Sequence, residues 1–220
     1  TGSICDLGGN SVEFAYIRKN VITDCNSALL GPLTIKKLGR ECENLDRYIR
    51  RQLSTAINFN PIKDESFFLI GGSWRAIAKI HMQRTKYPLK VIQGYKVMSN
   101  KLKKTLEFIR DSSFLTKYEE MNISLERLEL LPQSAHLLEI MIDELKIKAL
   151  TFSSFGVREG VIYHHLSEVE KKKDPLIEAA KFFEKKESRF PKMSQQAFKW
   201  ISPLYENLPR KTKRIILAAT

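Results

Sequence analysis

Long apolar runs are missing from this sequence, which argues against a chain that crosses a membrane as helices. No run approaches the roughly 18 to 20 residues that a membrane-spanning helix needs. The first residues also lack the charged-then-apolar pattern of a secretion signal. We therefore expect a soluble cytoplasmic protein without a membrane span.

Cysteine, glycine and proline are also scarce. The three cysteines, Cys5, Cys25 and Cys42, are an odd number with no close pairing and no histidine partner, so the sequence indicates neither a disulfide framework nor a zinc site. With only 10 Gly and 8 Pro, and with 43% hydrophobic and 28% charged residues, the composition is that of a globular protein rather than a disordered or fibrous one.

Acidic residues are outnumbered, 25 against 37 Lys and Arg, which gives a net charge of +12. Such a surplus attracts polyanions. Nucleic acid, an anionic lipid surface and a phosphate-rich substrate all fit the sign of the charge. The segment 168–220 holds half of the surplus and includes the run Lys171 to Lys173, which we interpret as part of a solvated linker.

Apolar periodicity predicts mixed α/β structure. Two strand-like runs flank the turn 8–11 and predict a β-hairpin. Further strands are predicted at 29–38, 67–70 and 149–154, and helices at 45–57, 73–82, 100–114, 124–145 and 157–166. Pro175 is expected to begin a helix of a separate module. At both ends the pattern looks interrupted, so we expect a fragment of a longer protein.

Three turns rich in small residues follow or join the predicted strands, at 6–11, 71–73 and 153–156. Glycines let the backbone approach an anion, and helix N-termini after the second and third turns favour negative charge. We also expect a positive φ at Gly9. Taken singly, each turn is equally compatible with ordinary turn chemistry.

Two carboxylates accompany the first turn. Asp6 precedes the glycines and suits Mg²⁺, which prefers oxygen ligands. Hairpin folding would bring Glu13 back beside the turn, where it would orient or deprotonate water. On these residues alone, an Asp and a Glu beside a hairpin are more often solvated surface carboxylates.

Several segments, in order along the chain, resemble the exopolyphosphatase and guanosine pentaphosphate phosphohydrolase family. The run 4–13, ICDLGGNSVE, resembles that family's phosphate-binding signature DIGGGSTE, and 71–76, GGSWRA, resembles its GGTWRA segment. Residues 130–132, LLP, and 155–163, FGVREGVIY, resemble the end of its second domain, and 174–175 with 188–191 resemble the start of its helical third domain.

The resemblance implies a fold of the actin, sugar-kinase and heat-shock ATPase superfamily, with two ribonuclease-H-like halves around a phosphate site. Residues 1–167 would be the second half, and 168–220 a linker and the beginning of an all-helical domain. The family's first domain, with its own phosphate loop and a water-activating glutamate, has no counterpart in this sequence.

The implied function is Mg²⁺-dependent hydrolysis of terminal phosphoanhydrides in inorganic polyphosphate, guanosine pentaphosphate or both. Glu13 would be catalytic, and Asp6 would place the metal. The phosphate-binding residues implied are Gly8, Gly9, Asn10, Ser11 and Arg158.

Asn10 stands where the family has a third glycine and Val12 where it has threonine, so the fit of the substrate stays open. The choice between the two substrates also stays open, as does homodimer formation.

Alternatives remain at this point. An ATP-dependent kinase or ATPase shares the same fold, and a basic module that binds polyanions without catalysis would explain the charge. No motif for specific nucleic-acid recognition is found. Arg158 is compatible either with phosphate binding or with a surface pair to Glu159, and Arg75 is expected to tie its helix to a neighbouring element.

Overall fold

The computed structural model describes residues 2–19, 21–41, 43–57, 66–111, 123–190 and 193–219. The chain divides into two compact units, Thr1–Glu159 and Gly160–Thr220. Within the described residues, no helix is both long and apolar enough to cross a membrane.

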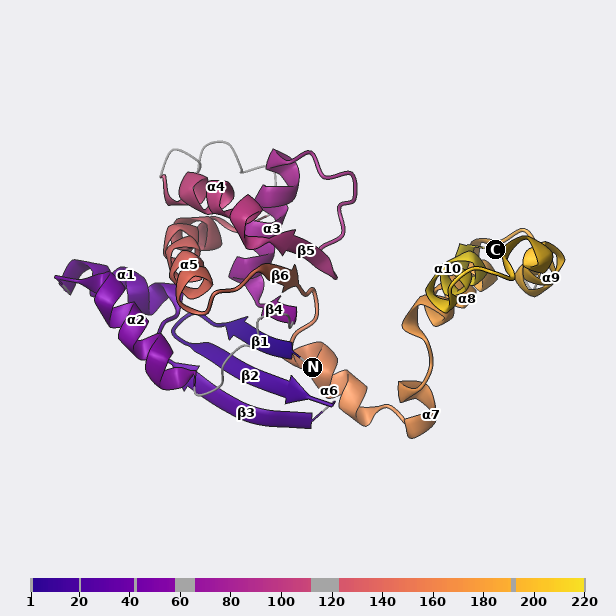
Figure 1. The fold of residues 1–220 in the computed structure, drawn as a ribbon, viewed down its shortest axis with the longest axis horizontal. Helices are drawn as coiled ribbons and strands as arrows, with labels where there is room; N and C mark the ends of the chain where they lie inside the picture. The colour runs from indigo at the N-terminus through magenta and orange to yellow at the C-terminus, as the bar shows by residue number, and fades with distance from the viewer. Residues whose placement is uncertain are drawn as a thin grey trace. The chain divides into compact units, whose positions relative to one another are not determined.

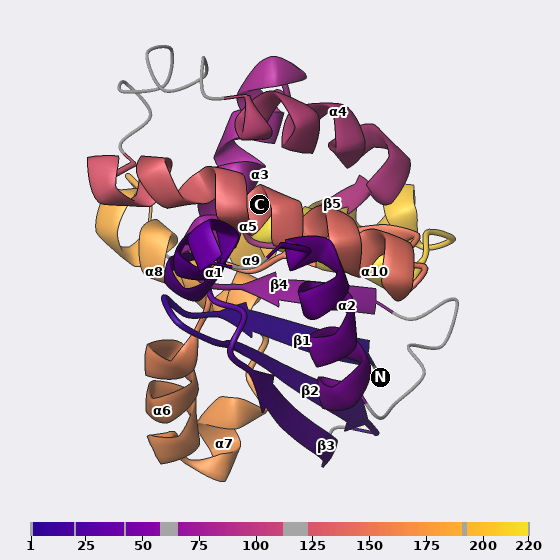
Figure 2. The same cartoon turned by 90° about the vertical axis from the view of Figure 1, so that its left-hand side faces the viewer.

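The first unit is built on a six-stranded sheet with strand order β3-β2-β1-β4-β6-β5 (Figures 1 and 2). The strands β1, β2 and β3 form an antiparallel meander, β4 pairs parallel to β1, β6 pairs parallel to β4, and β5 pairs antiparallel to β6. Their bounds are Gly2–Leu7 (β1), Val12–Arg18 (β2), Val21–Ala28 (β3), Ser66–Ile70 (β4), Tyr95–Met98 (β5) and Ala149–Phe152 (β6).

The direction of the side chains alternates along β1 and β2, and this alternation decides which of them enter the core. Cys5 and Leu7 of β1, with Val12 and Phe14 of β2, are buried. Asp6 and Glu13, the residues between them, are half-buried and pair directly across the hairpin. Because successive strand side chains point to opposite faces, both carboxylates lie on the face opposite the core.

The described residues of the first unit also form the helices α1 (Pro32–Glu41), α2 (Leu45–Ala56), α3 (Gly72–Arg84), α4 (Ser99–Arg110) and α5 (Leu125–Glu144). The long helix α5 contacts each of the other four, and Figure 2 shows α1 and α2 in front of the strands. The core joins the inward face of the sheet to apolar helix residues such as Trp74 and Leu138, both fully buried.

The prediction of a strand at 29–38 is wrong. Pro32 begins α1, and its fixed φ suits the first turn of a helix. The third strand is instead β3, whose polar residues obscured it in the sequence. It pairs only with β2, at the edge of the sheet, so most of its side chains do not need to be apolar. Strand β5 was also missed, since four residues give little periodicity.

The second unit is helical in its described part. Helix α6 (Val157–His165) spans the division, and α7 (Glu168–Lys171), α8 (Pro175–Glu187), α9 (Met193–Ile201), a 3₁₀ helix (Ser202–Tyr205) and α10 (Arg210–Ala219) follow. The segment 168–174, interpreted as a linker, therefore contains one helical turn. The prediction that Pro175 begins a helix is confirmed. Cys42 and Pro191, named in the sequence analysis, lie outside the described residues.

Asp174 joins the start of α8 to α10. Its carboxylate accepts a hydrogen bond from the Leu176 N–H at 2.9 Å and a bidentate pair from Arg214, one bond of which is 2.7 Å long. These bonds favour the charged form, and the Arg214 guanidinium is the main reason that the pKa of Asp174 falls to about 2.

We expect acid to loosen this junction. The folded pKa lies below the ordinary value, so the stabilisation is complete above pH 3.8 and disappears as the pH falls through about 2. The protection of the Leu176 amide from hydrogen exchange, corrected for the intrinsic exchange rate at each pH, should therefore fall between pH 4 and pH 2 more in the wild type than in Asp174→Asn, whose side chain cannot titrate. An equal loss of protection in both proteins would contradict this role of Asp174.

Candidate functional site

The first glycine turn links β1 to β2. The Gly8 N–H donates to the Ser11 carbonyl at 3.0 Å, so it is already used within the turn and does not serve an anion as the sequence analysis supposed. Within the described part of the chain, no hydrogen bond is donated by the N–H groups of Gly9, Asn10 and Ser11. These three amides are the available donors.

The segment that leads into α1 fixes the direction of those amides. The Gly9 carbonyl accepts from the Leu33 N–H at 2.9 Å. The Asn10 carbonyl accepts from the Gly31 N–H at 2.9 Å and from Thr34 Oγ1 at 2.8 Å. In a trans peptide the carbonyl and the following N–H point in opposite directions. The N–H groups of Asn10 and Ser11 therefore point away from α1, and no cis peptide occurs in the described chain.

Gly31 is needed for this close approach. A Cβ at that position would lie 2.3 Å from the Asn10 carbonyl carbon and 2.4 Å from the Gly9 carbonyl oxygen. Both distances are far inside van der Waals contact, and both atoms belong to the backbone. Only glycine therefore allows the two segments to pack together as they do.

The second glycine turn lies beside Asp6. Strands β1 and β4 run parallel with Asp6 opposite Ile70, so the turn that follows β4 meets the end of β1. Gly71 has a φ of +120°, and a Cβ there would lie 3.2 Å from Asp6 Oδ1. The expectation of a positive φ at Gly9 is wrong, because Gly9 is not among the described residues with positive φ. The strained conformation belongs to Gly71.

The charge of Glu13 acts on Asp6. Burial is the main cause that raises the pKa of Asp6, the neighbouring charge of Glu13 raises it further, and the Arg75 guanidinium partly offsets both. Glu13 accepts a hydrogen bond from Ser11 Oγ at 2.5 Å. The hydroxyl expected to contact phosphate therefore donates to Glu13, which leaves the Ser11 backbone N–H to face an anion.

The third turn is tied to the second by Arg75. The Ser153 N–H donates to the Leu69 carbonyl at 2.9 Å, which sets β6 beside β4, and Arg75 Nη1 donates to the Ser154 carbonyl at 2.8 Å. The expectation that Arg75 joins its helix to a neighbouring element is thus confirmed. Its charge also reaches Asp6.

Arg158 is not brought to the first turn by any described contact. It is exposed in α6 beside Glu159, and its charge contributes to lowering the pKa of that carboxyl. The main cause of that lowering is the hydrogen bond from the Gly156 N–H to Glu159 Oε2, 2.7 Å long. Arg158 thus acts on the neighbouring Glu159 through its charge, while the hydrogen bond that Glu159 accepts comes from the Gly156 backbone.

One cation near the turns was missed in the sequence. The Arg127 guanidinium packs against Gly72, so that a Cβ on Gly72 would lie 2.9 Å from Arg127 Cζ. Arg127 lies in the first turn of α5, which follows a segment outside the described residues. Nothing in the local sequence pattern connects it to the glycine turns.

A groove of about 230 Å³ is lined by the first glycine turn, the start of α3 and the start of α5. Its lining residues are Leu7, Gly8, Gly9, Pro32, Gly72, Ser73, Ser124, Glu126, Arg127 and Leu130.

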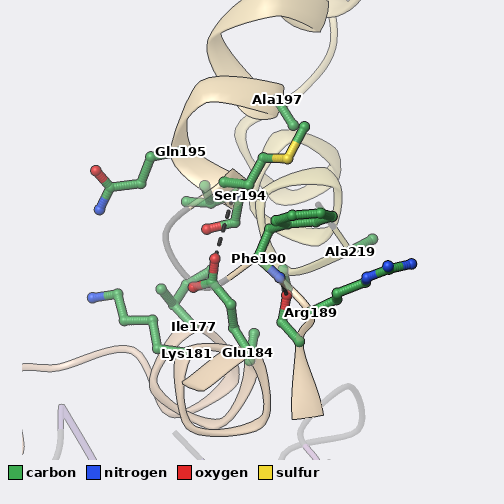
Figure 3. Close-up of a pocket in the computed structure, with 14 residues that line it drawn as sticks. Ile177, Lys181, Glu184, Arg189, Phe190, Ser194, Gln195, Ala197 and Ala219 are labelled. Atoms are coloured by element: carbon green, nitrogen blue, oxygen red, sulfur yellow. Dashed lines mark hydrogen bonds between the residues drawn. The ribbon is translucent and has the colours of Figure 1, made fainter. Parts of the chain in front are cut away.

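A larger groove, of about 970 Å³, lies within the second unit (Figure 3). Apolar side chains such as Ile177, Phe190 and Met193 contribute to its walls, and Glu184 Oε1 accepts from the Ser194 N–H at 3.2 Å. No glycine turn and no pair of carboxylates lines this groove. Its chemistry suits helix packing, so the groove at the glycine turns is the better candidate for an anion site.

The described residues contain no cluster of three or more His, Cys, Asp or Glu side chains suited to a metal ion. Asp6 and Glu13 are a pair at one end of the hairpin. A pair of carboxylates binds a divalent cation weakly by itself, but the same cation is held more firmly when substrate oxygens and water complete its coordination. The site therefore suits a metal that arrives with a phosphate ligand.

Comparison with known proteins identifies the first unit. The family model described as the Ppx/GppA phosphatase family matches residues 2–169. A Ppx/GppA phosphatase structure from Aquifex aeolicus, described as the type II variant, has a TM-score of 0.63 at 16% identity, covering 76% of this chain and 58% of that chain. An exopolyphosphatase structure from Cytophaga hutchinsonii has a TM-score of 0.60 at 17% identity, covering 73% and 55%. No curated protein sequence matches.

At these identities the solved structures show the fold. The α/β sheet with its helices matches the fold of these Ppx/GppA structures, so the prediction of the α/β fold is confirmed. This chain spans less than two thirds of the length of these solved relatives.

We expect Gly31→Ala to disturb the first turn. The new methyl group must displace the backbone of Gly9 and Asn10, which should lower the free energy of unfolding by about 1–3 kcal/mol. Gly39→Ala is the matched control in α1. Its Cβ would lie 3.6 Å from Leu45 Cδ2, an ordinary contact, so it should gain up to about 1 kcal/mol of helix propensity. Urea unfolding of both variants measures the difference, and wild-type stability in Gly31→Ala would refute the close approach.

Proposed function

Because the chain belongs to the Ppx/GppA phosphatase family, we propose that it forms one half of a hydrolase that releases orthophosphate from inorganic polyphosphate, guanosine pentaphosphate or both. The observation that carries the proposal is the hairpin itself. It holds two carboxylates in direct register, Asp6 and Glu13, beside a turn whose backbone donors point away from its supporting helix. The same fold also serves ATP-dependent kinases, and the family match favours the hydrolase.

In this proposal the N–H groups of Gly9, Asn10 and Ser11 hold the terminal phosphate. Backbone donors fixed before the substrate arrives need no reorganisation as negative charge spreads over the phosphoryl oxygens. Arg127, at the edge of the same groove, adds a guanidinium that suits bidentate contact with phosphate oxygens. Gly8 contributes shape rather than a donor, because its N–H is bonded to Ser11.

Asp6 would place Mg²⁺ beside the phosphate. A divalent cation fits here because its charge favours the ionised carboxylate, against the burial and the neighbouring Glu13 charge that raise the pKa of Asp6. When bound, the ion supplies Lewis-acid polarisation of a phosphoryl oxygen. Glu13, oriented by the Ser11 hydroxyl, would position the attacking water and accept its hydrogen bond.

The opposite wall of the site would come from outside these residues. The chain spans 55–58% of the solved relatives described above, and the family resemblance implies a preceding domain with a second phosphate loop and a water-activating glutamate. We propose residues 1–167 as the second ribonuclease-H-like domain and 168–220 as the linker and start of a helical domain. We propose Arg158 as a phosphate contact only in the complete protein, in which the preceding domain is present. A homodimer is also compatible with the site.

Glu13→Gln should lower turnover of the full-length protein by about 10²–10⁴-fold, since the neutral amide accepts a weaker hydrogen bond from the attacking water and lacks the negative charge that helps to polarise it. Glu107→Gln, which removes the same charge from an exposed position of α4, is the matched control and should keep its rate. Phosphate release from polyphosphate with Mg²⁺ measures both, and circular dichroism checks folding. An unchanged rate in Glu13→Gln would remove Glu13 from the mechanism.

The 220-residue chain by itself should hydrolyse polyphosphate little or not at all. Its half of the site is open to water, where electrostatic attraction is several-fold weaker than in a closed cleft. Salt-sensitive binding of polyphosphate should persist because of the net charge of +12. The full-length protein is the positive control for phosphate release. Turnover of the 220-residue chain within about tenfold of it, or about 1.4 kcal/mol in barrier, would refute the proposed division of labour.

A further inference from the structure

Helix α1 carries a row of cations on one face. Lys36, Lys37 and Arg40 follow Leu33 by three, four and seven residues, a spacing that places all four on the same side of a helix. These three cations are called the basic ridge below. The four residues, with Glu41, line a shallow groove of about 270 Å³.

The basic ridge begins at the proposed phosphate site. The Leu33 N–H donates to the Gly9 carbonyl at 2.9 Å, and a Cβ on Gly9 would lie 3.2 Å from Leu33 Cδ1. From Leu33 the helix rises 1.5 Å per residue, so Arg40 lies about 10 Å farther along the axis. The ridge is thus fixed to the turn and leads away from it.

Few acidic groups offset this charge. Lys37 and Arg40 are exposed, and neither makes a described ion pair. Lys36 Nζ lies 3.9 Å from Glu129 Oε2, with both side chains about half exposed, a pair of small energetic value. Arg40 alone would be explained by the helix dipole, since it lies in the last turn of α1. The dipole does not explain Lys36 and Lys37 in the middle of the helix.

We propose that the basic ridge binds the distal phosphates of a long polyphosphate chain whose terminal phosphate occupies the turn at Gly9, Asn10 and Ser11. This proposal rests on the proposed function and names polyphosphate as the substrate class that the site prefers. The Asn10 and Ser11 donors face away from α1, so a linear anion held by them must pass around Gly9 before it reaches the basic ridge. Only a chain of several phosphates is long enough to make both contacts. A short anion such as tripolyphosphate occupies the turn and reaches less of the ridge.

The test uses binding, so that it does not depend on catalysis. The double variant Lys37→Ala/Arg40→Ala of the 220-residue chain is titrated with long-chain polyphosphate and with tripolyphosphate at several NaCl concentrations. The control is Lys101→Ala/Lys104→Ala, which removes the same charge from exposed positions of α4. A second pair, Lys37→Gln/Arg40→Gln, keeps polar side chains in case the alanine variant does not fold.

The ridge variant should bind long polyphosphate about tenfold more weakly, and the slope of log affinity against log salt should become shallower by about 1 to 2. Its affinity for tripolyphosphate should stay within about twofold of the wild type, a change too small to reflect loss of a charged contact. The α4 control should behave like the wild type with both ligands.

Equal losses in the ridge and control variants would show that net charge alone binds the chain, and would overturn the proposal. Unchanged affinity for long polyphosphate in the ridge variant would overturn it as well. The same loss with single-stranded RNA would make α1 a nucleic-acid surface instead. The proposed function is tested separately, by phosphate release from the full-length protein. If the ridge variant binds as the wild type does, the proposed hydrolase activity is unaffected. If the full-length protein releases no phosphate, the binding result still tests the basic ridge.

Discussion

The hydrogen bonds that join the first glycine turn to the start of α1 are the constraint on which the site depends. They occupy the carbonyls of Gly9 and Asn10, and the planarity of the peptide then fixes the opposite direction for the amides. A turn with the same sequence but free carbonyls would rotate its donors among several directions. Here the fold sets them before any ligand binds, which is the condition for electrostatic preorganisation.

The same hydrogen bonds explain why Gly31 matters although it belongs to none of the phosphate motifs in the sequence. Its role depends on the Asn10 backbone, 21 positions earlier in the chain. Gly8 is the opposite example, because it belongs to the motif but its N–H is not free for a ligand. The motif suggests that all its amides face the ligand, but hairpin closure uses the first of them. Motifs name the residues of a site, while pairing geometry decides which atoms remain free.

Much of the fold was predictable because its signals are local. The hairpin, the strand before Gly71 and the helix after it each follow from a few neighbouring residues. The helix at Pro32 was mistaken for a strand because apolar residues are evenly spread there, and β3 was missed because an edge strand needs little apolar sequence. Arg127 was missed for a different reason: its partner Gly72 lies in another helix, and only packing brings them together. Asp6 and Glu13 were predictable as a pair because both belong to one hairpin.

The strand order also has a consequence for self-association. Among the strands that the structure describes the sheet is open, so β3 and β5 each lie at an edge with backbone donors and acceptors that no described strand pairs. Such edges are templates for addition of a strand from another molecule. On this chain β5 has only four residues and includes Lys96, while β3 includes Asp24 and begins after a turn that contains Lys19. Short length and charge at these two edges oppose edge-to-edge aggregation, even where Val21 and Ile22 are exposed.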